Sequence, residues 1–268
     1  MKHLYELKVL LRGGGEMASA VALALWHGHI RYICVTEIDQ PTAIRRGVCF
    51  SEAVYDREKT VEGVRAERVE DLRAVQLCWE NDLLPVLVDP QARIRKELAP
   101  DVLIDGTLRK RVIDTALSDA PCVIALGPGF WAGRDAHVVI ETNRGHHLGR
   151  LIERGEAEPD TGMPGAILGV TEARVLRSPS DGVFITDRNL RDFVQPGDRI
   201  GAVNDASVVS PIAGVLRGLI RPGSCVTTHM KIGDVDPRGD PLYCDTVSDK
   251  ARTIAGGVLQ ALLMRFNR

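Results

Sequence analysis

Six short runs of aliphatic and β-branched residues divide residues 8–145 of this 268-residue chain. They read KVLL, YICVT, LPVLVD, DVLID, CVIALG and HVVIET. Continuous apolar runs of this length are typical of strands in a sheet that is covered on both faces. Amphipathic stretches such as VEDLRAVQLCWEN and QARIRKELA lie between several of them, and strands that alternate with helices favour a mostly parallel α/β sheet. We therefore predict a Rossmann-like domain over residues 1–173.

The pattern changes at residue 174, where one motif is written twice. The corresponding positions are Ser178-Pro179 and Ser210-Pro211, Gly182-Val183 and Gly214-Val215, and Pro196-Gly197 and Pro222-Gly223. Short strands that are separated by Pro-Gly turns and repeated in this way predict a small β domain over residues 174–236. This doubled module resembles a biotinyl/lipoyl-type barrel-sandwich. A swinging-arm carrier would have its modified lysine between the two copies, but the joint, AVNDASVV, has no lysine. A structural module or a docking surface is therefore expected.

Residues 237–268 are expected to end in a helix that packs on the core. Ser248 is a suitable N-cap, and the apolar residues that follow at helical spacing are Leu259, Leu262, Leu263 and Phe266. Gly256 and Gly257 are costly in a helix interior, so we expect close packing against another backbone at this point.

Composition and charge exclude several classes of protein. The formal net charge is −2, which gives no bulk electrostatic reason to bind nucleic acid or an acidic membrane. The six cysteines are scattered without metal-ligand spacing, so we expect a reducing compartment and neither a metal site nor a disulfide framework. The apolar stretch before Arg12 is too short for a signal peptide, and no segment approaches the length of a membrane span. These features predict a cytoplasmic protein with no membrane partner, and they leave a homo-oligomer open.

The glycine loop after the first predicted strand is the strongest candidate for a binding site. Gly13-Gly14-Gly15 and Ala18 form a G-x-G-x-x-A pattern between a strand and a helix. In such a loop Gly13 would make the turn, Gly15 would let a diphosphate approach the backbone, and Ala18 would allow close helix–strand packing. Glu37 ends the second predicted strand, where an acid accepts a ribose hydroxyl. Glu16 would repel a phosphate unless its side chain turns away, and the alternative interpretation is a tight turn that binds nothing.

Other polar residues extend this candidate site. Gly127 and Gly129 follow the CVIALG strand and could offer backbone amides to an anion. Arg144 and His146 lie near the start of a predicted helix further on, and His146 and His147 are expected to point to different faces, which argues against a shared metal. The remaining candidates are Asp105 at the carboxyl end of a strand, Arg45 and Arg46 for a further phosphate, and Lys110 and Arg111. The plainer interpretation of Arg144 and His146 is a solvated loop with a basic helix start, and that of Arg45 and Arg46 is ordinary surface.

Six blocks of sequence are longer and more distinctive than the glycine motif. They read RGGGEMASAVA, VTEIDQPTAIRRGVCFSEAVYD, GPGFWAGRDAHVVIETNRGHHLGR, DTGMPG, KIGDVDPRG and SDKARTIAGGVLQALL. Together they resemble the selenium-dependent molybdenum hydroxylase accessory family, which is related to the xanthine dehydrogenase accessory proteins. The resemblance implies a maturation factor that binds a nucleotide or the nucleotide-bearing molybdenum cofactor and handles its sulfur or selenium ligand. Its implied partners are a molybdenum hydroxylase and a sulfur or selenium donor protein.

Two other functions stay open. The glycine loop and the acid at Glu37 would also suit an NAD(P)-dependent oxidoreductase, although we find no convincing set of residues for hydride transfer. A non-catalytic structural adaptor would use both glycine loops as turns. No catalytic residue is assigned, and whether the chain is an enzyme is left open.

Overall fold

The computed structural model describes residues 2–109 and 114–267, and the chain divides into two compact units. The first unit comprises the chain up to Pro41, Cys49–Asp160, and the chain from Val247 onward. The second unit comprises Thr42–Val48 and Thr161–Thr246. The units are therefore not consecutive stretches of chain, unlike the predicted domains. None of the described helices is long and apolar enough to cross a lipid bilayer.

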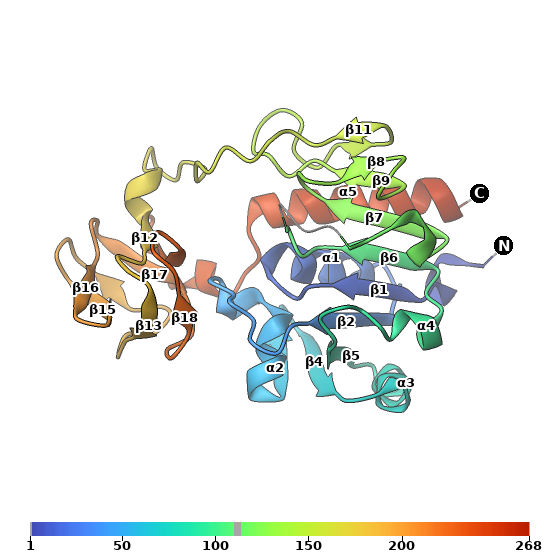
Figure 1. The fold of residues 1–268 in the computed structure, drawn as a ribbon, viewed down its shortest axis with the longest axis horizontal. Coiled ribbons are helices and arrows are strands. Elements are labelled where there is room, and N and C mark those ends of the chain that lie inside the picture. Colours follow the sequence, from blue (N-terminus) through green and yellow to red (C-terminus); the bar gives the residue numbers. More distant parts are fainter. Residues whose placement is uncertain (1, 110–113, 268) are drawn as a thin grey trace. The chain divides into compact units, whose positions relative to one another are not determined.

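The first unit is built on a nine-stranded mixed sheet (Figure 1). The strands from β9 to β4 in the sheet run parallel, whereas β10 and β3 pair antiparallel at the two edges. In order across the sheet they are β10 (Leu151–Ile152), β9 (Val138–Ile140), β7 (Cys122–Leu126), β6 (Val102–Asp105), β1 (Val9–Arg12), β2 (Ile33–Glu37), β5 (Leu84–Val88), β4 (Val64–Val69) and β3 (Glu58–Val61). The predicted Rossmann-like fold class was wrong. The polar hairpin of β3 and β4 at one edge and β10 at the other add antiparallel pairs, so the sheet is a large mixed one.

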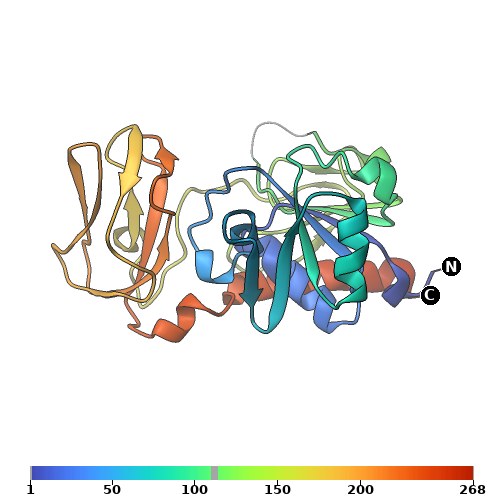
Figure 2. The ribbon, with the colours of Figure 1, turned by 90° about the horizontal axis from the view of Figure 1, so that it is seen from below.

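Helices cover both faces of this sheet (Figures 1 and 2). On one side, α1 (Glu16–His27) and α5 (Asp249–Phe266) pack against each other. Val139 of β9 belongs to the buried cluster that contains residues of α3 (Leu72–Glu80) and α4 (Arg95–Leu98), whereas the next residue, Ile140, lies against Gly257 of α5. Since successive strand residues point to opposite faces, α3 and α4 cover the other face. The shorter elements of this unit are η1 (Leu4–Glu6), η3 (Phe50–Glu52), α2 (Ala53–Asp56), η4 (Leu117–Asp119) and the strand pair β8 (Trp131–Ala132) and β11 (Gly155–Glu156).

The C-terminal helix begins and packs as the sequence predicts. The Ser248 side chain accepts a hydrogen bond from the N–H of Ala251, as an N-cap does. A Cβ atom on Gly257 would lie 2.3 Å from the carbonyl oxygen of Gly149, so α5 approaches this backbone closely. A Cβ atom on Gly256, in contrast, would have no neighbouring atom within 4 Å, so close packing explains only one of the two glycines.

The second unit consists of two four-stranded antiparallel sheets. One has the order β12 (Val175–Arg177), β19 (Lys231–Asp236), β17 (Gly214–Leu219), β14 (Phe193–Val194), and the other β16 (Ala206–Val209), β15 (Arg199–Val203), β13 (Gly182–Ile185), β18 (Cys225–Val226). Short helical turns, η2 (Arg46–Val48), η5 (Glu172–Arg174) and η6 (Pro241–Cys244), complete it. The expected biotinyl/lipoyl-type barrel-sandwich is corrected to these two separate sheets.

The doubled motif is visible in the backbone of the second unit. The Ser178 hydroxyl donates to the carbonyl of Ser180 at 2.6 Å, and the Ser210 hydroxyl donates to that of Ile212 at 2.7 Å. The paired turn glycines Gly197 and Gly223 have φ angles of 90° and 84°. Each copy of the motif contributes two strands to each sheet, which explains why equivalent positions recur.

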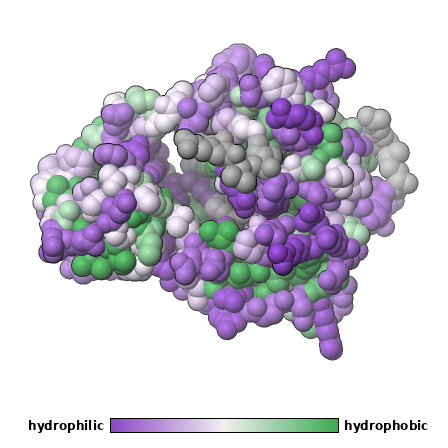
Figure 3. Space-filling model, viewed as in Figure 1, coloured by the Kyte–Doolittle hydropathy of each residue, from purple (hydrophilic) through white to green (hydrophobic). Residues whose placement is uncertain are grey.

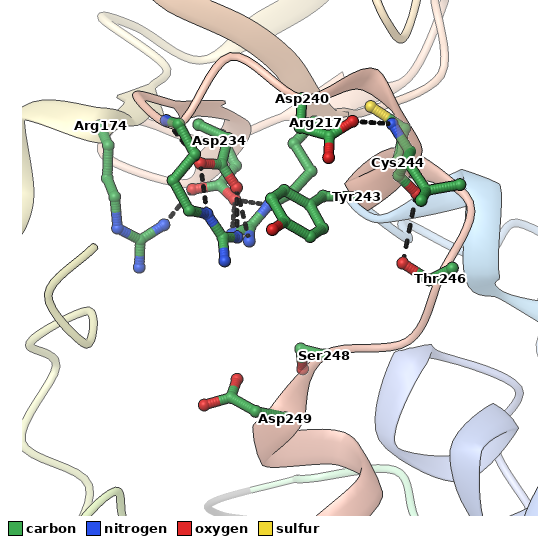
Figure 4. Close-up of polar contacts among 12 residues, drawn as sticks. Arg174, Arg217, Asp234, Asp240, Tyr243, Cys244, Thr246, Ser248 and Asp249 are labelled. Atoms are coloured by element: carbon green, nitrogen blue, oxygen red, sulfur yellow. Dashed lines mark hydrogen bonds and ion pairs between the residues drawn. The ribbon is translucent and has the colours of Figure 1, made fainter. Parts of the chain in front are cut away.

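A buried ion network lies on β17 and β19 (Figure 4). Asp234 and Asp236 are 1% and 0% exposed. Arg174 and Arg217 both donate to Asp234, and Arg217 Nη1 lies 3.0 Å from Asp236. Arg238 donates its Nε–H to Asp236 at 2.9 Å. Burial lowers the pKa of Arg174. Burial alone would raise the pKa of Asp236, but hydrogen bonds from Arg238 leave the pKa of Asp236 below its usual value. Buried charges are tolerated when they are paired in this way.

Candidate ligand-binding site

The carboxyl ends of β1 and β2 carry the glycine loop and Glu37. Gly13 has a φ of +86°, and a Cβ there would lie 3.3 Å from the backbone of Gly106. Both features favour glycine, because other residues rarely adopt a positive φ and their Cβ would crowd the connection after β6. Ala18 lies against the same neighbour, since a Cβ on Gly106 would come within 2.9 Å of the Ala18 methyl group. The loop therefore packs closely on the connection after β6.

Both the N–H and the carbonyl group of Gly14 are hydrogen-bonded. Its N–H donates to Glu37 Oε1 at 2.7 Å. Its carbonyl accepts from the Ser19 hydroxyl at 2.9 Å and from the Ser51 N–H at 3.0 Å. A Cβ on Gly14 would lie 2.7 Å from the Ser51 nitrogen, so this glycine is fixed by its neighbours inside the unit.

Gly15, in contrast, faces open space. It is the N-cap of α1 with φ −68° and ψ 178°, and no atom beyond its two chain neighbours lies within 4 Å of its Cβ position. No side chain caps this helix end, so the first N–H groups and the positive end of the helix dipole are left without a capping side chain. Glu16 turns away from the loop, because its Oε1 accepts from the Ser248 N–H at 3.1 Å. The repulsion expected from its charge is thereby reduced.

Glu37 is half-buried and fixed by two backbone donors. One carboxylate oxygen accepts from Gly14 at 2.7 Å, and the other accepts from the N–H of Ile38 at 2.8 Å. Burial raises the pKa of Glu37, and the two hydrogen bonds and the cation of Arg109 only partly offset it. The carboxylate is oriented before any ligand arrives.

Asp105 lies at the end of β6, beside β1, within a buried polar network. Its Oδ1 accepts from the hydroxyl of Thr107 at 2.6 Å, and its Oδ2 accepts from the hydroxyl of Thr115 at 2.6 Å. The guanidinium of Arg12, 3% exposed, lies 3.4 Å from Asp105 and 3.0 Å from Asp114. Asp105 therefore sits at the expected sheet edge, with an arginine partner on the neighbouring strand.

In the second glycine cluster, Gly127 makes its contacts with neighbouring residues of the protein. The Gly127 N–H donates to the carbonyl of Ile140 at 2.9 Å, and a Cβ there would lie 2.5 Å from the Thr142 hydroxyl oxygen. Gly129 follows with a φ of 104°. The amide of Gly127 is thus used by the sheet, and the space beside it is filled by Thr142.

Arg144 and His146 lie in a turn, and the helix expected there is absent from the described residues. Arg144 makes two hydrogen bonds to the Asp249 carboxylate, at 2.6 and 3.1 Å. His146 is exposed, and its ring lies edge to face with that of His147 at a centroid distance of 5.1 Å. The two rings are therefore neighbours, contrary to the expectation that they point apart, because the turn has neither helical nor strand periodicity. The described residues contain no cluster of ligands that could hold a metal ion.

Arg45 and Arg46 belong to the second unit and donate hydrogen bonds to its backbone. Arg45 Nη2 donates to the carbonyls of Tyr243 and Thr246 at 2.7 and 3.0 Å, and Arg46 Nε donates to that of Leu219 at 2.7 Å. These contacts anchor the Thr42–Val48 segment on its own unit. Lys110 and Arg111 lie outside the described residues.

Lys250 is a charged neighbour of Glu16 that the sequence did not single out. It lies in the first turn of α5, two residues after Ser248, whose N–H contacts Glu16. Burial and the neighbouring cation of Arg144 lower its pKa, against the attraction of Asp160, Glu16 and Glu141. Only the fold brings these residues together, so no local motif could have identified the lysine.

Comparisons with known proteins give one relative in sequence and several in structure. No protein-family model matches the chain. The chain is 45% identical over 256 residues to the uncharacterized protein YqeB of Escherichia coli (strain K12), covering 96% of this chain and 47% of YqeB. It therefore spans about half the length of that relative.

Similar solved structures share little sequence with the chain. The succinylglutamatedesuccinylase/aspartoacylase from Rhodobacter sphaeroides is 13% identical, with 85% of each chain covered and a TM-score of 0.27. The product-bound ectoine utilization protein EutE (DoeB) from Ruegeria pomeroyi is 15% identical, with 78% of this chain and 58% of that chain covered and a TM-score of 0.25. TcdA (CsdL) is 11% identical, with 99% and 90% covered and a TM-score of 0.36. Likenesses this low assign no activity to the chain.

The predicted relation to the selenium-dependent molybdenum hydroxylase accessory family was wrong. No family model matches the chain, and the relative found in sequence is the uncharacterized protein YqeB. The predicted function in molybdenum hydroxylase maturation, with its molybdenum and selenium chemistry, was therefore wrong as well. The alternatives of an NAD(P)-dependent oxidoreductase and of a structural adaptor gain no support from these comparisons either.

Proposed function

We propose that the first unit binds a nucleotide at the carboxyl ends of β1 and β2. The observation that carries this proposal is the Glu37 carboxylate, held by the N–H groups of Gly14 and Ile38 at 2.7 and 2.8 Å. A carboxylate has about four lone-pair positions for hydrogen bonds. Two of them are used by the backbone, and the remaining pair can accept the two neighbouring hydroxyls of a ribose.

The phosphates would lie at Gly15. Open space at its Cβ position leaves room for a bulky anion to approach the backbone. The N-terminus of the 12-residue helix α1 supplies N–H donors and a positive dipole end. The place of the loop in the sheet supports this position, because Gly15 follows the carboxyl end of β1 and ligands of open α/β sheets bind beyond the carboxyl ends of the strands.

Glu37 also argues for the kind of ribose that is accepted. A phosphate on the 2′-hydroxyl would place a second anion beside a half-buried carboxylate that has two backbone partners, and like charges at contact repel. We therefore expect nucleotides with free ribose hydroxyls to bind, and NADP⁺ to bind more weakly than NAD⁺.

Substitution of Gly15 tests where the phosphates lie. The variant Gly15→Val is expected to fold, because its φ and ψ suit any residue and no atom beyond its two chain neighbours lies within 4 Å of the Cβ position. Its free energy of unfolding should change by no more than about 1 kcal/mol, the usual scale for an N-cap. Its affinity for ADP, measured by calorimetric titration of the full chain, should fall at least about tenfold, because the side chain fills the space a diphosphate needs.

Gly256→Ala provides the matched control, since that position is equally open but lies within α5. It should bind ADP as the unsubstituted chain does. Unchanged ADP affinity in Gly15→Val would exclude the phosphates from this loop.

A further inference from the structure

A pocket of about 570 Å³ opens at the carboxyl ends of β4 and β5 within the first unit. Apolar side chains line part of it, namely Leu72, Leu87, Val88 and Ile94. Its charged lining consists of Glu70, Asp71, Asp89, Glu97 and Arg93. This volume is ordinary for a small-molecule site, about 300–1,000 Å³. The excess of carboxylates makes it a poor place for a phosphate.

The pocket begins next to Glu37. Val88, which lines it, pairs with Glu37 across the parallel strands β2 and β5. The N–H of the next residue, Asp89, donates to the Glu37 carbonyl at 2.9 Å. Neighbouring strands are about 4.8 Å apart. A ribose held by Glu37 would therefore present its base to this pocket, one strand further along the sheet.

Among the acidic residues of the pocket, Asp89 is the one whose backbone is hydrogen-bonded to Glu37, the proposed ribose acceptor. Its Oδ2 accepts from the N–H of Ile94 at 2.8 Å, which orients the side chain. On the face seen in Figure 3, most exposed residues are hydrophilic and hydrophobic residues occupy smaller areas. The pocket differs from such a surface because it combines apolar side chains with an oriented carboxylate.

We infer that this pocket holds the base of the nucleotide and selects a base with an exocyclic amino group, adenine before hypoxanthine; this inference rests on the proposed function. Leu87, Val88 and Ile94 offer apolar contacts for the faces of a base. An ionised carboxylate can only accept hydrogen bonds, so Asp89 suits an amino donor. Hypoxanthine has an oxo group in place of this amino group, so the same contact would bring two hydrogen-bond acceptors together.

Calorimetric titration of the full chain with ADP and with IDP tests the inference, because these ligands share ribose and phosphates and differ at the base. ADP is expected to bind at least about tenfold more tightly, since a site built around one hydrogen bond rejects the analogue that lacks it. Equal affinities would overturn the assignment of the base pocket and leave the proposed ribose and phosphate site standing. Absence of binding by both ligands would overturn the proposed function and this inference together.

The variant Asp89→Asn sharpens the test. Asparagine can still accept from the Ile94 N–H through its oxygen, and it then turns an amide donor toward the base. The preference for ADP over IDP should therefore disappear or reverse. Asp198→Asn, in the second unit, is the matched control: its carboxylate also accepts from a backbone N–H, that of Gln195 at 2.9 Å. An unchanged preference in folded Asp89→Asn would overturn the role of Asp89.

Discussion

Replacing Asp234 with alanine is expected to destabilise the second unit by about 3–5 kcal/mol, the usual cost of removing one partner of a buried ion pair. Asp234 is 1% exposed and accepts hydrogen bonds from both Arg174 and Arg217. Without it, two guanidinium groups keep their charge in a buried environment, and Asp236 alone faces Arg217. The free energy of unfolding in urea, followed by a probe in the second unit, measures the loss.

Asp245→Ala is the control for this experiment. Asp245 also pairs with an arginine, Arg191, but their side chains are 39% and 60% exposed. Exposed pairs contribute only about 0–1 kcal/mol. If Asp234→Ala lost no more stability than Asp245→Ala, the network would not hold the second unit together.

Two neighbouring glycines in α5 are expected to respond to alanine with opposite signs. A Cβ at position 257 would lie 2.3 Å from the Gly149 carbonyl oxygen and 3.1 Å from Ile140. Gly257→Ala must therefore push α5 away from the sheet, and overpacking of this kind costs about 1–3 kcal/mol. Gly256→Ala meets no atom within 4 Å and should gain up to about 1 kcal/mol, because alanine is the better helix former.

Thermal unfolding of the two variants beside the unsubstituted chain checks this pair of expectations. Both variants add one methyl group to the same helix, so differences in composition cannot explain a difference in sign. A melting temperature of Gly257→Ala at or above that of the unsubstituted chain would contradict the close approach of α5 to Gly149.

Much of the first unit could be predicted from local pattern. The six apolar runs coincide with β1, β2, β5, β6, β7 and β9, because strands buried on both faces have continuous apolar sequences. The hairpin of β3 and β4 was missed, since EKTV and VRAERV are mainly polar and only four of their ten residues are buried. That hairpin is part of what makes the sheet mixed, so a missed local element became an error in fold class.

The second unit illustrates the limits of a repeat as a predictor. The doubled motif correctly marked equivalent turns, because turn glycines have a conformational requirement that is visible in sequence. It did not determine how the strands divide between sheets. Nor did it indicate that Thr42–Val48 belongs to this unit, because such a segment is joined by contacts with residues far away in the chain, such as Leu219.

The candidate site divides in the same way. Gly13, Gly14, Gly15 and Glu37 come together as expected, because adjacent parallel strands end at one edge of the sheet. Arg45 and Arg46 were grouped with this loop only because they follow Glu37 in sequence. Asp89 and Lys250 were missed, since their significance depends on pairing of β2 with β5 and on the position of α5.

Calorimetric titration of the full chain with ADP and with 2′-deoxy-ADP is the most direct test of the central claim. If the Glu37 carboxylate receives the ribose hydroxyls, the deoxy ligand should bind at least about tenfold more weakly, the value of one hydrogen bond to a charged group. Binding of ADP with an equal affinity for the deoxy form, or no binding of either, would contradict a ribose site at Glu37.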